Sequence, residues 1–124
     1  MEKEDWKTTV DRLSDLKPFI DYLEGTGDDE WTVDIVRTEG NKQNCVMGHL
    51  MNWYYGKEYK GVIAQAWDMF EEMWATTYML YPVNDGRSPE WMNYRYEQKT
   101  PKERVIAYLR NLAEGKEKTT NQLR

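Results

Sequence analysis

The first 24 residues carry apolar side chains at helical spacing. They recur every three or four positions, at Trp6, Val10, Leu13, Leu16, Ile20 and Leu23. This spacing predicts an amphipathic helix. Pro18 interrupts it, because proline lacks the backbone N–H and clashes with the preceding turn. We therefore expect a kink, or a second helix that starts at Pro18 and ends at Gly25.

Residues 31–37 alternate between apolar and polar positions, which is typical of a strand. Trp31, Val33 and Ile35 would share one face. Residues 38–41 have the composition of a turn, and residues 42–45 can return as a second strand. An isolated hairpin is marginal in water, so we expect this one to pack on the helices.

Three helical segments are expected after the hairpin. The first covers residues 45–55 and ends at Gly56, and the second covers residues 59–81 and is apolar nearly all round. Residues 82–99 are predicted to form a long loop. The last helix begins at Thr100-Pro101-Lys102-Glu103, where Thr100 is an N-cap and Glu103 completes a capping box.

These elements predict an α+β fold, with four or five helices packed around one short antiparallel β-hairpin. At 124 residues the chain is long enough for a single hydrophobic core. We expect one globular domain over residues 1–115 and a disordered charged tail over residues 116–124.

The formal net charge is −5, but residues 99–124 carry seven basic and three acidic side chains. Nucleic-acid binding by the acidic body is not expected, because affinity for phosphates comes from Lys and Arg. A single cysteine cannot form an internal disulfide and suits a reducing compartment. The acidic N-terminus has no signal-peptide pattern and no apolar run is long enough to span a membrane. We expect a cytoplasmic protein without cofactors.

The segment Asn44-Cys45-Val46-Met47-Gly48-His49-Leu50 holds the only cysteine and the only histidine. A cysteine at a helix N-terminus can have a lowered pKa, and His49 could act as its base, with Asn84 or Asp85 orienting the imidazole. The alternative is that Cys45 is a small core residue. A metal site is not expected, because Cys45, His49 and Asp85 are the only ligands in prospect.

Six carboxylates fall within residues 21–34 without a basic residue among them: Asp21, Glu24, Asp28, Asp29, Glu30 and Asp34. Such a run could contact a basic protein surface. The alternative is an ordinary solvated loop.

The chain has six Trp and nine Tyr but only two Phe. Trp and Tyr are enriched at the centres of interfaces. Trp53 and Tyr55, with Trp91 and Tyr94 in the predicted loop, are candidates for a binding surface. The alternative is that these rings fill the core and hold the loop.

The order of the motifs resembles an uncharacterised family of small bacterial and phage proteins, over roughly residues 18–112. The likeness rests on the Cys-x-x-Gly-x-Leu helix start at Cys45, Gly48 and Leu50, on the Asn84-Asp85 pair and on the Thr-x-x-Glu-x-Val helix that begins at Thr100. This chain departs from the family at His49, where a small residue is usual. The resemblance implies an α+β fold and a phage or mobile-element origin, and it implies no activity.

The function that the sequence favours is a non-catalytic, acidic protein-binding module. With the phage context that the resemblance adds, it would be an accessory protein that binds and inhibits a host protein. One alternative is a cysteine-dependent hydrolase or transferase that uses Cys45 and His49. Another is a structural subunit or homodimer that buries its aromatic surface against a second copy.

Overall fold

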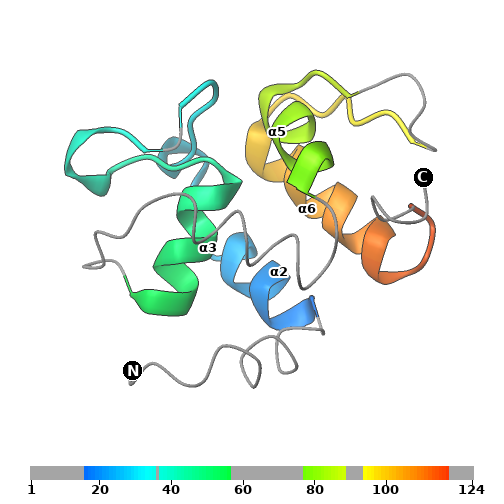
Figure 1. Cartoon of the computed structure of the whole chain (residues 1–124), viewed down its shortest axis with the longest axis horizontal. Helices are drawn as coiled ribbons and strands as arrows, with labels where there is room; N and C mark the ends of the chain where they lie inside the picture. Colours follow the sequence, from blue (N-terminus) through cyan, green and yellow to red (C-terminus); the bar gives the residue numbers. More distant parts are fainter. Residues whose placement is uncertain (1–15, 36, 57–76, 89–93, 118–124) are drawn as a thin grey trace.

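The computed structural model describes residues 16–35, 37–56, 77–88 and 94–117. Within these ranges the chain is helical (Figure 1). The α-helices are α2 (Lys17–Glu24), α3 (Val46–Tyr55), α5 (Thr77–Asp85) and α6 (Pro101–Ala113), and the short 3-10 helices are η1 (Asp28–Glu30) and η2 (Glu39–Asn41). The helix predicted at the N-terminus before residue 16 and most of the helix predicted over residues 59–81 lie outside the described residues.

The helices enclose one core. Helix α6 packs against α5 and α2, α3 packs against α2 and α5, and α2 lies between α3 and α6 in Figure 1. Helices α2 and α6 bury mainly one face, whereas α3 is buried nearly all round. The largest fully buried apolar side chains are Phe19, Leu23, Met47, Leu50, Leu80, Tyr108 and Leu109. Burial of such a side chain stabilises the fold by about 1.5–3 kcal/mol.

Several predicted helix ends are confirmed. Thr100 Oγ1 accepts a hydrogen bond from the Glu103 N–H at 3.2 Å, so the N-cap of α6 forms as its sequence indicates. Helix α2 ends at Gly25 and α3 ends at Gly56. Gly56 has φ of 95°, a conformation that side-chain-bearing residues rarely adopt, which explains why glycine ends this helix.

The predicted β-hairpin, and with it the α+β class, is wrong. Among the described residues no strand forms, and Trp31 and Arg37 each make only an isolated bridge to Asn44. Asp34 lies in the left-handed region, with φ of 66°, and therefore breaks the extended backbone. Trp31 is buried whereas Ile35 is 52% exposed, so the alternating residues do not share a buried face.

The predicted loop over residues 82–99 begins later than expected. Helix α5 continues through Pro82 to Asp85. The chain then leaves the helix at Gly86, which has φ of 80°. Gly86 also lies close to the Arg104 guanidinium, because a Cβ added there would be 3.4 Å from Arg104 Cζ.

Arg104 and Lys102 of α6 satisfy the carbonyls at the ends of two other helices. The Arg104 guanidinium donates to the carbonyls of Val83 at 2.9 Å and Asn84 at 2.8 Å. Lys102 Nζ donates to the carbonyls of Glu24, at 3.1 Å, and of Thr26. The last carbonyls of a helix lack intrahelical partners, so α6 closes the C-terminal ends of both α5 and α2.

After α6 the chain turns back on itself. The buried side chain of Glu117 accepts a hydrogen bond from the Tyr96 hydroxyl at 3.1 Å, and Asn111 Nδ2 donates to the same hydroxyl at 3.0 Å. These contacts fasten the segment before α6 to the turn that follows it. The remainder of the predicted tail, residues 118–124, lies outside the described residues.

We expect Tyr96→Phe to lower the free energy of unfolding at pH 7 by about 1–3 kcal/mol, because the buried Glu117 carboxylate loses the hydrogen bond from the Tyr96 hydroxyl. Burial raises the pKa of Tyr96. The hydrogen bond from Asn111 lowers this pKa in part, and the Glu117 carboxylate raises it further. Since the folded pKa lies above the unfolded value of about 10, this contribution is complete below pH 10 and is lost as the pH rises through the folded pKa.

Urea denaturation between pH 7 and pH 11 measures the effect. The wild type is expected to lose stability above about pH 10 more steeply than the variant. The matched control is Tyr94→Phe, because Tyr94 is 46% exposed. Equal alkaline slopes for the wild type and Tyr96→Phe would contradict the assignment.

Candidate functional site

Cys45 lies at the N-cap of α3 and is 1% exposed. Burial raises the pKa of its thiol, and hydrogen bonds from the backbone of Gly48 and Met47 oppose this only in part. The nearby Asp85 carboxylate raises the pKa further. At neutral pH the thiol is therefore protonated and shielded from solvent, whereas a nucleophilic cysteine needs an exposed thiolate.

His49 joins α3 to η1. It is buried, and its Nε2 lies 3.1 Å from the carbonyl oxygen of Glu30. Because a carbonyl only accepts, Nε2 is the nitrogen that donates. The imidazole also packs against the ring of Trp31, with the centroids 4.3 Å apart. These contacts hold η1 against α3.

Asn84, fully buried, connects three segments of the chain. Its Oδ1 accepts from the Val46 N–H at 3.0 Å, which is one of the N–H groups at a helix start that have no intrahelical partner. Its Nδ2 donates to the carbonyl of Thr32 and to Asp85 Oδ1, both at 3.0 Å. Asp85 Oδ1 in turn accepts from the Asp34 N–H at 3.2 Å.

The structure thus gathers Asn84 and Asp85 around the start of α3, next to Cys45. Both amide atoms of the Asn84 side chain and one carboxylate oxygen of Asp85 bind the backbone or each other, and the thiol is buried. This arrangement stabilises the fold and does not favour nucleophilic catalysis. Among the described residues, no group of three or more His, Cys, Asp or Glu is placed to hold a metal ion.

We expect iodoacetamide to alkylate Cys45 in the folded protein at pH 7 about a hundredfold more slowly than in the denatured protein. The reason is that reaction requires local opening of the core around α3. Mass spectrometry measures the alkylated fraction against time, and Cys45→Ser provides the unlabelled control. Rapid alkylation of the folded protein below pH 7 would instead indicate an activated thiol.

The carboxylates of the acidic run are in different environments. Asp21 and Glu24 form ion pairs with Lys17 and Arg110, and Asp34 lies 3.0 Å from Arg87. Asp28 and Asp29 are exposed on η1, whereas Glu30 is half-buried and lines a cavity. The acidic surface is therefore centred on η1.

The loop over residues 31–35 is anchored at several points. Trp31 is buried and its Nε1 donates to Thr26 Oγ1 at 2.8 Å. Beyond this anchor Val33 is 37% and Ile35 is 52% exposed. These two and Tyr94 are the exposed large apolar side chains of the described ranges.

The candidate aromatic residues that the structure describes are in different environments. Trp53 is half-buried with its ring 5.1 Å from that of Phe19, and Tyr55 packs edge-on against Tyr54 at 4.5 Å. Both rings pack against the core. Tyr94 is exposed, and Trp91 lies outside the described residues.

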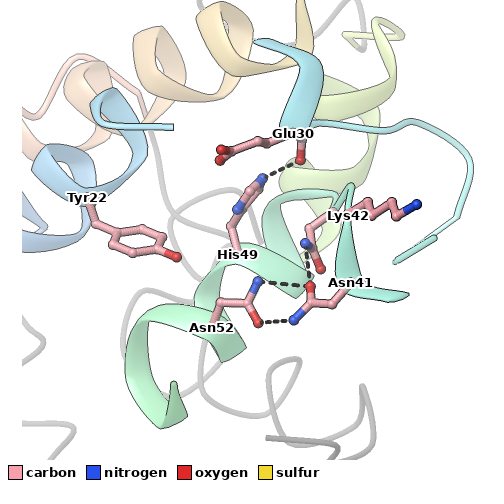
Figure 2. Close-up of a pocket in the computed structure, with 7 residues that line it drawn as sticks. Tyr22, Glu30, Asn41, Lys42, His49 and Asn52 are labelled. Carbon is pink, nitrogen blue, oxygen red and sulfur yellow. Dashed lines mark hydrogen bonds between the residues drawn. The ribbon is translucent and has the colours of Figure 1, made fainter. Parts of the chain in front are cut away.

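Sequence reasoning missed a network that involves Arg37 and three asparagines, of which Figure 2 labels Asn41 and Asn52. Arg37 donates to Asn44 Oδ1 at 2.7 Å and to Asn52 Oδ1 at 3.0 Å. Asn41 donates to Asn52 at 3.1 Å and accepts from Asn44 at 2.8 Å. One signal was available, because Asn52 follows His49 by three positions and so shares its face of an otherwise apolar helix.

None of the helices in the described ranges is long and apolar enough to cross a membrane. Comparison of the chain with protein-family models, with curated proteins and with solved structures gives no match.

Proposed function

We propose that the protein is a non-catalytic binding module whose contact surface is the loop over residues 28–35, here called the acidic loop. The observation that carries this proposal is the exposure of Val33 and Ile35, two large apolar side chains, on a loop that begins with the exposed carboxylates Asp28 and Asp29. Apolar side chains within a polar rim are characteristic of protein interfaces.

The acidic loop is held in place by the rest of the fold. The Thr32 N–H donates to the Asn44 carbonyl at 3.1 Å, and the Thr32 carbonyl accepts from Asn84. Asp34 is joined to Asp85 through its N–H and to Arg87 through its carboxylate. A loop that is ordered before binding loses less conformational entropy on association, so a small contact can give useful affinity.

The charge of the acidic loop specifies the partner. Asp28 and Asp29 make no ion pair with another described residue, and together with the net charge of −5 they attract a basic surface. The partner should therefore carry an apolar patch surrounded by Lys and Arg. The resemblance to small phage proteins supports a host protein as the partner and inhibition, in the host cytoplasm, as the outcome.

Quantitative capture from a bacterial host lysate tests the proposal. Ile35→Ser should weaken binding of the captured partner about tenfold or more, since an isoleucine loses its burial. Asp28→Lys/Asp29→Lys should also weaken it, whereas the matched reversal Glu97→Lys/Glu114→Lys, outside the acidic loop, should not. The purified partner should lose activity with the wild type and keep it with Ile35→Ser.

A partner that binds the wild type and the acidic-loop variants equally would exclude this surface. Light scattering on the purified protein provides a separate outcome. A dimer that Ile35→Ser converts to a monomer would show that the loop binds a second copy of the chain, and the homodimer alternative would replace the proposal.

A further inference from the structure

A cavity of about 240 Å³ lies between η1, η2, α2 and α3. One wall is the asparagine network, and the others are formed by Tyr22, Glu30 and His49 (Figure 2). Pockets for drug-sized ligands are usually about 300–1,000 Å³. This cavity is therefore suited to a smaller group, such as the end of one side chain.

The asparagine wall is rigid and largely occupied with its own bonds. Asn52 Oδ1 accepts from both Arg37 and Asn41, and Asn41 Oδ1 accepts from both Asn44 and Asn52. These amide oxygens each hold two donors, so they have little capacity to receive a ligand. The asparagine network therefore shapes the cavity, and the other lining residues would form the hydrogen bonds with a ligand.

Glu30 and Tyr22 supply the open acceptor capacity. Within the described ranges, neither the Glu30 carboxylate nor the Tyr22 hydroxyl forms a hydrogen bond or an ion pair. Both groups line the cavity, and burial and then the Glu30 charge raise the pKa of Tyr22. In Figure 2 both point into the space beside His49, whereas the Lys42 side chain points away from it.

We propose that this cavity binds a guanidinium group, supplied by an arginine of the protein partner. A guanidinium is planar, presents five N–H donors and pairs with a carboxylate through two parallel hydrogen bonds. The Glu30 carboxylate would accept these two hydrogen bonds from the guanidinium, and the Tyr22 hydroxyl would accept a third. Because Glu30 ends η1 directly after Asp28 and Asp29, the exposed carboxylates attract the basic surface and the cavity anchors one of its side chains.

This inference rests on the proposed binding function, but it can be tested apart from it. The probe is N-acetyl-arginine amide, titrated into the full chain and followed by NMR at the side-chain amides of Asn41 and Asn52. We expect saturable shifts with arginine and none with the citrulline analogue, which has the same shape without the charge. Glu30→Gln should weaken arginine binding about tenfold or more, and Tyr22→Phe should weaken it less.

The control is Asp29→Asn, which removes the same charge from the exposed part of η1 and should leave arginine binding within about twofold of the wild type. Equal binding of arginine and citrulline, or unchanged binding by Glu30→Gln, would overturn the inference.

Partner capture separates the two proposals. If Ile35→Ser abolishes capture and Glu30→Gln does not, the cavity inference fails and the binding function stands. If the arginine probe binds through Glu30 but neither the acidic-loop variants nor Glu30→Gln affects capture, the ligand is a free guanidinium compound and the assignment to a partner side chain is wrong.

Discussion

Arg104→Met is expected to lower the free energy of unfolding by about 3–5 kcal/mol. Arg104 is 8% exposed, and its guanidinium donates to the carbonyls of Val83, Asn84 and Gln98 at 2.8–2.9 Å. Methionine fills similar space but donates nothing, so the Asn84 and Gln98 carbonyls lose these hydrogen bonds. The Val83 carbonyl keeps the bond from the Gly86 N–H at 3.2 Å. Urea denaturation at pH 7 measures the loss.

The control for this substitution is Arg110→Met on the same helix. Arg110 is exposed and pairs only with the exposed Glu24 among the described contacts, so we expect a change below about 1 kcal/mol. A loss for Arg104→Met as small as that of the control would show that the end of α5 does not depend on the guanidinium. The packing of α5 on α6 would then have to come from apolar contacts alone.

Asn84→Asp is expected to lower the free energy of unfolding at pH 7 by about 3 kcal/mol or more. The new carboxylate can still accept from the Val46 N–H, but its other oxygen faces the Thr32 carbonyl and Asp85 instead of donating to them. Burial and the neighbouring Asp85 raise the folded pKa of this carboxyl above its unfolded value of about 3.9. The variant is therefore most stable, relative to the wild type, below that value, and the deficit grows as the pH rises through the folded pKa.

Denaturation at several pH values between 4 and 7 measures this deficit. Asp85→Asn retains an acceptor oxygen for the Asp34 N–H and removes the charge beside residue 84. Combined with Asn84→Asp, it should recover part of the loss, and a double-mutant cycle gives the coupling between the two positions. A small loss that does not vary with pH would contradict the connecting role of Asn84.

The residues that the enzyme alternative would use show how far a motif can be interpreted without the fold. The sequence correctly places Cys45 at the start of a helix, because the apolar spacing and Gly56 define that helix. It cannot show that this end of the helix is covered. The side chain of Asn84, which is 38 positions from Val46, occupies the helix start where a substrate would have to bind.

The acidic run also combines a property that the sequence determines with one that only the packing determines. Its charge follows directly from the sequence, but the distinction between the exposed Asp28 and Asp29 and the inward Glu30 depends on how η1 packs against α3. The cavity beside Glu30 is formed by side chains from four elements, η1, η2, α2 and α3, and no local pattern contains them together.

Local chemistry determined the ends of α2, α3 and α6, because caps, proline and glycine act within a few residues of their position. The tertiary structure determined that residues 31–35 form a loop and not a strand. Their alternation is compatible with a strand, but a strand needs a partner along its length. Here Asn44 pairs with both Trp31 and Arg37, while Asn84, Asp85 and Arg87 bind Thr32 and Asp34. The contacts from residues 84–87 come from a distant segment, and they hold the chain as a loop that exposes Val33 and Ile35 where a hairpin would have buried them.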